Sequence, residues 1–256
     1  PASDREETII ATNTFLGTTS KKRVILKCKT FYGEDYISNS VVEDAADAHA
    51  YLYIDKAAVE AGATKIHRNI YISSECESLD DLCMDSNNID LRVCFDKKGN
   101  ANWTSMQYTF SNSHLYEMPE NMPDTVTDYT STFDYATFTK DNIENFQLSN
   151  KAVVAKGMFR ATNIVSIPSN LFDKAKKLEN TANMLSLCSS LADVSIGLPN
   201  SVTVMTDMFL DTRALRGTIV LSDGITDDME RCFSWAGVDA SNYQGYNTPL
   251  LVFHNP

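Results

Sequence analysis

The stretch Val202-Thr-Val-Met205-Thr-Asp-Met208-Phe209-Leu-Asp-Thr-Arg-Ala-Leu215 decides the fold, because its pattern recurs six times from residue 103 onward. Phe209 closes the apolar pattern, and the residue at this place in each repeat is its anchor. The anchors follow one another at spacings of 23, 26, 26, 24 and 24 residues. They are Phe110, Phe133, Phe159, Leu185, Phe209 and Phe233. Repeats of this length indicate a solenoid of stacked units.

The residues one, four and seven places before each anchor are mostly apolar. In the repeat of Phe209 they are Met208, Met205 and Val202. On a helix with 3.6 residues per turn these offsets lie on one face. The pattern therefore predicts a short helix that ends near each anchor and buries one apolar stripe against the neighbouring units.

A short strand is expected after each helix. An apolar residue follows each anchor by five or six places, and several of these residues begin an L-x-x-L-x-L-like run that is typical of leucine-rich-repeat strands. These residues are Leu115, Phe138, Ile164, Leu191, Leu215 and Val238. A seventh, fainter repeat is predicted around Leu79 to Met84, with Met84 lying 26 residues before Phe110.

These columns resemble the BspA-type leucine-rich repeat family, whose units carry a V-x-x-M-x-x-M-F helix followed by an L-x-x-L strand. The match is closest from Val202 to Leu215, and the segment Cys188-Ser-Ser-Leu191 matches the family's Cys-Ser-Ser-Leu. The resemblance implies an α/β repeat fold, a leucine-rich-repeat-like solenoid of short strands and short helices over residues 76–240. It also implies a recognition surface without catalytic residues, as in adhesins of bacteria and mucosal protists and in related virion proteins.

The strand face of such a solenoid is the expected place for binding. Residues on either side of the fourth position of an L-x-x-L-x-L strand are expected to point away from the core. In register these candidate binding residues are Glu117, Lys140, Ser166, Asp193, Ser195, Gly217 and Ile219. The alternative is an ordinary solvated face of a small sheet.

Residues 1–75 lie outside the repeat frame and predict an N-terminal α+β cap or a docking domain. Strands are expected at Thr8–Ala11, Arg23–Leu26 and Lys65–Ser73, and a helix at Val41–Ala61. Residues 241–256 form a C-terminal cap or tail, whose apolar run Pro249–Phe253 either closes the solenoid or adds to a neighbouring subunit.

Composition narrows the function. The formal net charge is −12, which disfavours nucleic-acid binding. No apolar run of membrane-spanning length occurs, so membrane insertion is not expected. The polar start Pro1–Glu7 has no apolar signal core and favours a protein made in the cytoplasm without an export signal, although a cleaved or engineered end would read the same way.

The chain offers no set of catalytic or metal-binding residues. The four histidines are scattered, and no nucleophile elbow or glycine-rich phosphate loop is present. The six cysteines contain no C-x-x-C pair, so buried thiols are expected, with a bridge between Cys76 and Cys83 left open. We therefore expect a protein that is not an enzyme and needs no cofactor and no metal.

Two functions fit the repeat pattern and the composition, and both place other proteins or a host surface among the partners. The first is a structural or attachment component of a multi-copy assembly, such as a decoration protein on a phage or virus particle. The second is a bacterial or protist cell-surface adhesin that binds a host protein or glycan. The lack of an apolar signal core at the start favours the first.

Overall fold

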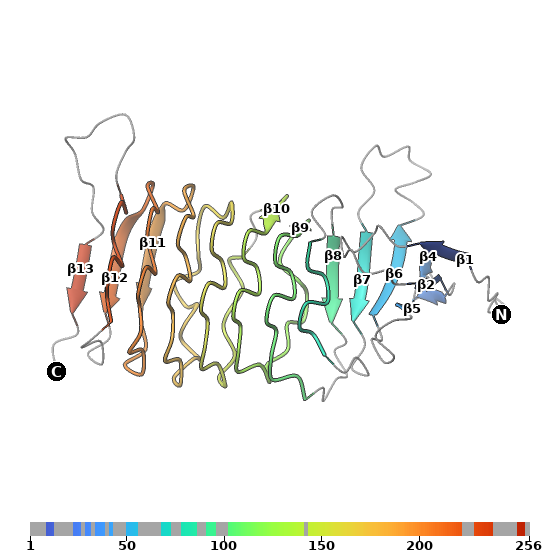
Figure 1. Cartoon of the computed structure of the whole chain (residues 1–256), viewed down its shortest axis with the longest axis horizontal. Coiled ribbons are helices and arrows are strands. Elements are labelled where there is room, and N and C mark those ends of the chain that lie inside the picture. Colours follow the sequence, from blue (N-terminus) through green and yellow to red (C-terminus); the bar gives the residue numbers. More distant parts are fainter. Residues whose placement is uncertain are drawn as a thin grey trace.

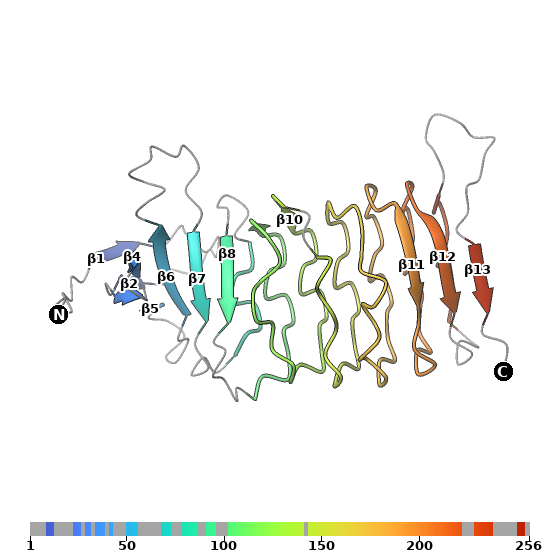
Figure 2. The same ribbon diagram turned by 180° about the vertical axis from the view of Figure 1, so that it is seen from behind.

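The computed structural model describes thirteen separate ranges of the chain. These are residues 9–12, 23–26, 29–31, 34–38, 41–42, 50–55, 68–72, 78–85, 91–95, 102–140, 143–221, 228–237 and 250–253. Successive segments of the chain lie side by side along one long axis, as seen from both faces (Figures 1 and 2).

Thirteen strands form three sheets in these ranges. The orders are β1-β2-β5, β10-β9-β8-β7-β6-β4-β3 and β11-β12-β13. The bounds are β1 Ile9–Thr12, β2 Arg23–Leu26, β3 Lys29–Phe31, β4 Glu34–Ser38, β5 Val41–Val42, β6 Ala50–Asp55, β7 Arg68–Ile72, β8 Leu91–Phe95, β9 His114–Leu115, β10 Thr137–Phe138, β11 Asp193–Gly197, β12 Arg216–Leu221 and β13 Leu250–Phe253.

The six repeats stack in the register that their sequences define. The residue five places before each anchor forms a parallel bridge with its counterpart in the next repeat. This column is Ser105, Asp128, Val154, Asn180, Val204 and Asp228. The anchor rings stack as well, with centroids 5.4 Å apart for Phe110 and Phe133 and 5.3 Å apart for Phe133 and Phe159. Each repeat is therefore one coil of a continuous stack.

The short helices expected before the anchors are absent from the described residues, which contain no helix. The segments are runs of turns instead, and we call them the turn layer. Two residues in each run, two places before and two places after the anchor, have φ between 49° and 63°. Right-handed helices need φ near −63°, so these residues rule a helix out. Every third residue still faces inward, which is why the spacing resembled a helix.

The turn layer satisfies its backbone amides in two alternating ways. In each coil from that of Phe110 to that of Phe209, four amides donate to carbonyl groups of the next coil. The amides of the residues directly before and after the anchor donate within the coil to the carbonyl three residues back, as Thr132 does to Tyr129 and Asp134 to Ser131. In the coil of Phe133 the first set is Tyr129 to Val154 at 2.9 Å, Ser131 to Lys156, Phe133 to Met158 and Tyr135 to Arg160, the last three at 2.8 Å. Buried backbone groups must be paired, and these four bonds exist only when the next coil is stacked in place.

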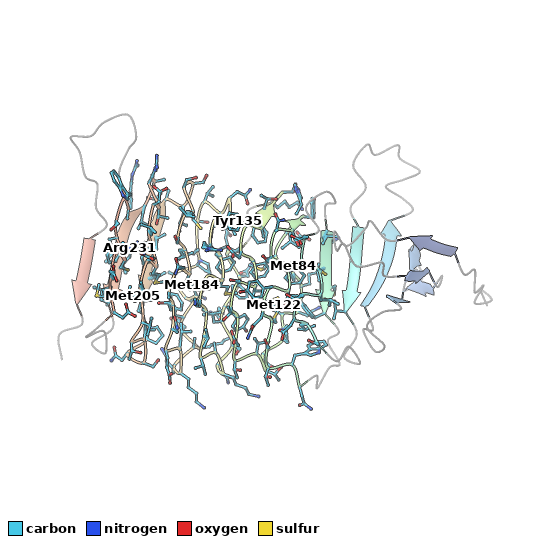
Figure 3. The ribbon with its side chains drawn as sticks, in the orientation of Figure 1. Met84, Met122, Tyr135, Met184, Met205 and Arg231 are labelled. Carbon is cyan, nitrogen blue, oxygen red and sulfur yellow. The ribbon has the colours of Figure 1, made fainter. Side chains whose placement is uncertain are left out.

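The columns expected to be apolar form the core. Val202, Met205, Met208 and Phe209 are all 0 % exposed. Figure 3 shows side chains of this kind in coils along the stack, with Met184 and Met205 labelled in its C-terminal half. Methionine suits such positions because its flexible thioether fills irregular gaps.

The seventh repeat lies in the stack one residue out of the predicted phase. Cys83, not Met84, takes the anchor position, because its amide donates to the carbonyl of Thr109 at 2.8 Å. Asp81 and Asp85 have the positive φ angles that flank every anchor. Cys83 is buried, whereas Met84 is only partly buried.

Four of the N-terminal strands, β3, β4, β6 and β7, extend the sheet of the stack, whereas β1, β2 and β5 form a separate sheet. β7 pairs with β8 in parallel, so the sheet runs across the expected boundary at residue 75, while β6 pairs antiparallel with β7. The helix predicted over 41–61 is wrong where the structure describes it, because β5 and β6 lie there. Tyr51, Tyr53 and Ile54 favour a strand, and this preference outweighs the alanines on either side. Residues 56–61 lie outside the described part.

The C-terminal apolar run is strand β13. It pairs in parallel with β12, from Thr218 opposite Leu250 to Leu221 opposite Phe253. β13 is the last strand in the order of its sheet. The expected tail therefore adds one more strand to the sheet of β11 and β12.

Gly217 sets the register of β12. It lies opposite Val194, so this strand is one residue out of the frame counted from Leu191 and Leu215. Its φ is +107°, and a Cβ atom there would lie 2.0 Å from the carbonyl oxygen of Val194. Only glycine has the conformation and the space that this adjustment needs.

We predict that Gly217→Ala lowers the free energy of unfolding by about 2 kcal/mol or more, because the added methyl group meets backbone and the φ angle is strained. Gly197→Ala is the matched control, since its Cβ would make only an ordinary 3.8 Å contact with Val220. This control should change stability by less than about 0.5 kcal/mol. Urea denaturation measures both, and equal effects would contradict the register of β12.

Candidate functional site

The predicted strand-face residues do not share one environment. Lys140, Asp193 and Ser195 are exposed, whereas Glu117 and Ser166 are partly buried. Ile219 is 0 % exposed, so its prediction as an outward-facing residue is wrong. The cause is the shift at Gly217: Arg216 and Thr218 are the partners of Asp193 and Ser195, which places Ile219 in the core column of Ile196.

The strand face is also interrupted. The side-chain amide of Asn163 accepts from the backbone N–H of Phe138 at 2.8 Å and donates to its carbonyl at 2.9 Å. It therefore takes the place of a neighbouring strand beside β10. Ser166 follows in a segment that is not a strand, between the sheet that ends at β10 and the sheet that begins at β11. The seven predicted residues consequently fall into separate groups.

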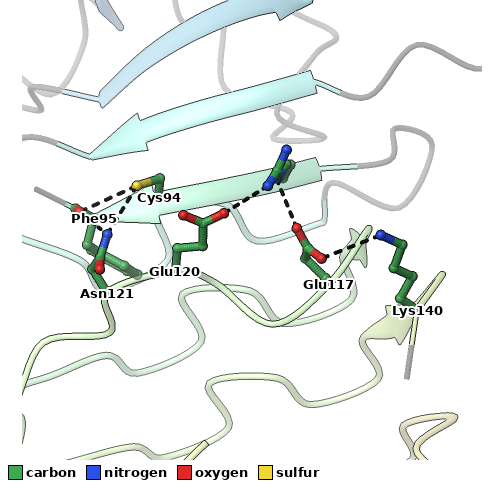
Figure 4. Close-up of polar contacts among 7 residues, drawn as sticks. Cys94, Phe95, Glu117, Glu120, Asn121 and Lys140 are labelled. Carbon is green, nitrogen blue, oxygen red and sulfur yellow. Dashed lines mark hydrogen bonds and ion pairs between the residues drawn. The ribbon is translucent and has the colours of Figure 1, made fainter. Parts of the chain in front are cut away.

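Glu117 and Lys140 belong to a network of charges across β8, β9 and β10 (Figure 4). Glu117 contacts Arg92 Nε at 2.9 Å and Lys140 Nζ at 3.8 Å, while Arg92 Nη2 contacts Glu120 at 2.9 Å. The Lys140 ammonium also lies 4.3 Å from the ring centre of Tyr116. A hydrogen bond to Tyr116, with a smaller contribution from Glu117, raises the pKa of Lys140. Two cations and two carboxylates neutralise one another here, so the network ties neighbouring coils together.

The end of β8 has a second polar contact in the same view. The side-chain amide of Asn121 donates to the carbonyl of Phe95 at 3.3 Å and to Cys94 Sγ at 3.4 Å. Asn121 has a φ of 56°, a conformation that asparagine adopts more readily than most residues. This contact holds the loop after β9 against β8 and offers no reactive group.

The turn layer carries exposed aromatic side chains that the repeat pattern did not single out. Tyr108 is 41 % exposed, Tyr135 51 % and Trp235 58 %. All three occupy the positions of positive φ beside an anchor. The signal in the sequence was an aromatic residue where other repeats have Asn, Asp, Gly, Ser, Ala, Leu or Arg. It has meaning only once these positions are known to be left-handed.

Arg160 lies beside one of these rings. Its guanidinium makes two bonds to the buried carboxylate of Asp134, Nε to Oδ1 at 2.8 Å and Nη2 to Oδ2 at 2.6 Å. The guanidinium carbon is 5.2 Å from the ring centre of Tyr135. The hydrogen bond to Asp134 raises the pKa of Arg160, and weaker interactions with Tyr135 and Tyr108 act in the same direction. The guanidinium is therefore held between the Asp134 carboxylate and the Tyr135 ring.

A similar pair occurs three coils further on from Phe133. Arg231 makes two bonds to Asp207, Nε to Oδ1 at 2.9 Å and Nη2 to Oδ2 at 2.7 Å. Both members lie two places before their anchors, so the pair joins adjacent coils. Arg231 has no aromatic contact of the kind made by Arg160 among those that the structure describes.

Two further properties concern the described ranges only. They contain no cluster of three His, Cys, Asp or Glu side chains that could hold a metal ion. In the same ranges no helix has the length and apolar character needed to cross a membrane.

The cysteines of the turn layer are inert by environment. Burial raises the pKa of the Cys188 thiol to about 11 and that of Cys232 to about 12. Cys188 Sγ donates to the carbonyl of Phe159 at 2.9 Å. Reactive cysteines have lowered pKa values and access to solvent, so these two are structural. Cys28 and Cys76 lie outside the described residues.

We predict that Glu117→Ala lowers the free energy of unfolding by about 1 kcal/mol at low salt, since it leaves Arg92 and Lys140 without their shared acceptor. High salt should reduce the loss, because the partners are half exposed. Asp193→Ala is the control on the same face and should change stability by less than about 0.5 kcal/mol. Equal losses in urea denaturation for the two variants would show that the network contributes nothing.

The buried thiols predict a fall of stability at alkaline pH. An unfolded thiol ionises near pH 9.0, whereas Cys188 keeps its proton to about pH 11, so the stabilisation is full below pH 9 and is lost above it. Between pH 9 and 10 each such thiol should cost about 1 kcal/mol. Cys188→Ala removes one of the buried thiols. Alanine is tolerated at this place in the repeat, since Ala136 also lies three places after its anchor. Urea denaturation at both pH values should give a shallower fall for this variant, and an unchanged fall would contradict the assignment.

Comparison with protein-family models, with characterised proteins and with solved structures finds no match for this chain.

Proposed function

We propose that this chain is a non-enzymatic protein of the BspA-like leucine-rich-repeat type that acts as a structural or attachment component of a larger assembly, such as a decoration protein on the surface of a phage or virus particle. The observation that carries the proposal is the coil of Phe233, the last coil of the turn layer that the structure describes. An internal coil uses both of its faces for stacking, whereas no coil is described on one face of the coil of Phe233.

The coil of Phe233 has backbone donors without acceptors in the part of the chain that the structure describes. In each coil from that of Phe110 to that of Phe209, four amides donate to the next coil. The corresponding amides of Met229, Arg231, Phe233 and Trp235 have no acceptor among the described residues. An unpaired N–H group that becomes buried is costly, so this end favours a partner that brings carbonyl groups.

Apolar surface accompanies these donors. Phe233 stacks on Phe209 with ring centroids 5.3 Å apart, but it is only partly buried because no further anchor lies beyond it in the described part. In the strand layer, β13 pairs with β12 and with no other described strand. A partner segment that adds one more coil would meet backbone donors, a ring face and a strand edge together, which is the logic of strand addition at an open edge.

We predict that Phe233→Lys abolishes incorporation into the assembly, because it places a charge where the partner's apolar side chain would stack. Phe233→Leu should retain incorporation, since leucine is the native anchor at Leu185. Tagged chains expressed in the native source and separated on a density gradient give the fraction in large complexes. A Phe233→Lys chain with a native unfolding midpoint and unchanged sedimentation would overturn the proposal, as would a native chain found only as a monomer.

The second candidate is an adhesin at a bacterial or protist cell surface that binds a host protein or glycan. The exposed rings of Tyr108, Tyr135 and Trp235 favour it, because tyrosine and tryptophan are enriched where proteins recognise partners. It predicts binding through the turn layer with the C-terminal end of the stack unused. The two candidates therefore differ in which variants lose function.

A further inference from the structure

The left-handed positions of the turn layer are filled in two different ways. Most contain residues that tolerate positive φ or are small. These are Asn112, Ser131, Gly157, Ala161, Asn183, Asp207 and Asp211. The other five are bulky: Tyr108, Tyr135, Leu187, Arg231 and Trp235, with φ between 49° and 63°. A bulky side chain there strains the backbone, and an exposed one gains little burial in return. Of these five, Tyr135 also has a guanidinium 5.2 Å from its ring centre. Strain and this contact together point to a use at the surface.

Tyr135, Arg160 and Asp134 form one cluster across two adjacent coils. The amide of Tyr135 donates to the carbonyl of Arg160 at 2.8 Å, which holds the two coils in register. The guanidinium of Arg160 is bound to Asp134 and lies 5.2 Å from the ring centre of Tyr135. Tyr135 is labelled in Figure 3.

The polar part of the cluster is electrically neutral and still offers donors. The Asp134 carboxylate is 5 % exposed and balances Arg160, whose side chain is 37 % exposed. The pair uses two of the five N–H groups of the guanidinium, one on Nε and one on Nη2, so three donors are left over on this partly exposed side chain. The pair leaves no unbalanced cation to attract an anionic ligand, and the whole chain has a net charge of −12.

We propose that Tyr135, Arg160 and Asp134 form a binding site for a neutral carbohydrate chain. The apolar C–H face of a sugar ring suits an exposed tyrosine ring, and its hydroxyl groups suit the fixed planar guanidinium. Neighbouring left-handed positions hold small or polar residues, here Ser131 and Gly157, and do not form the apolar surround of a protein hot spot. The inference rests on the second candidate function, because a pure scaffold has no use for this site.

The test uses Tyr135→Asn in the full chain. Asparagine tolerates the positive φ, so the variant should unfold at an equal or higher urea concentration than the native chain. A glycan array with neutral and sialylated oligosaccharides identifies the neutral glycan that the native chain binds, and calorimetry then gives the affinities. We expect Tyr135→Asn to weaken binding at least tenfold. Leu187→Asn, which makes the same relief of strain at φ 63° two coils away, should leave affinity unchanged.

Several outcomes would overturn the carbohydrate site: no neutral glycan bound by the native chain, binding of sialylated glycans alone, or full affinity in Tyr135→Asn. Loss of a protein partner in place of a glycan would do the same. Testing each variant in the other assay separates the assembly proposal from the carbohydrate proposal. Phe233→Lys should retain glycan binding and Tyr135→Asn should retain incorporation, so each proposal can fail while the other stands.

Discussion

The fold depends on chains of peptide groups that run head to tail through the stack. The carbonyl of Asp128 accepts from the coil before it, and the N–H of the same peptide group, on Tyr129, donates to the coil after it. Four such chains pass through the turn layer between the coils of Phe110 and Phe233. They fix the distance between coils and the direction of stacking, and they place each anchor ring over the next. Single hydrogen bonds contribute only about 1 kcal/mol each, but a coil out of phase would lose four together.

Sequence periodicity located the coils and the inward columns because burial leaves a mark on side-chain types. Val202, Met205 and Phe209 were recognisable for this reason. Backbone conformation leaves a weaker mark: Tyr135 and Trp235 adopt a left-handed angle that their side chains do not suggest. The apolar residues recur every three positions, and we interpreted this interval as a helix, but a series of tight turns produces the same interval. The wrong prediction for Ile219 also came from the backbone, because Gly217 shifts the register of β12 by one residue without changing which of its residues are apolar.

The candidate sites could likewise be predicted only in part. Glu117 and Lys140 could be placed on the strand face from register alone, but their mutual neutralisation with Arg92 needed three coils to be seen together. The cluster of Tyr135, Arg160 and Asp134 could not be found from the sequence, since Tyr135 and Arg160 are 25 residues apart and meet only through stacking. On the strand face, charged side chains pair with one another and hold neighbouring coils together. The turn layer instead leaves aromatic rings exposed at strained backbone positions. We therefore assign cohesion to the strand face and propose recognition for the turn layer.

The head-to-tail peptide chains also give the molecule an electrical axis. Each group in a chain points its N–H toward the C-terminal end, so the small dipoles add along the stack instead of cancelling as they do between alternating strands. Among the described coils, partial positive charge gathers on that of Phe233, and partial negative charge gathers on that of Cys83, at the carbonyls of Asp80, Leu82 and Met84. In a protein with a net charge of −12, the backbone of the coil of Phe233 thus has a local polarity opposite to the net charge.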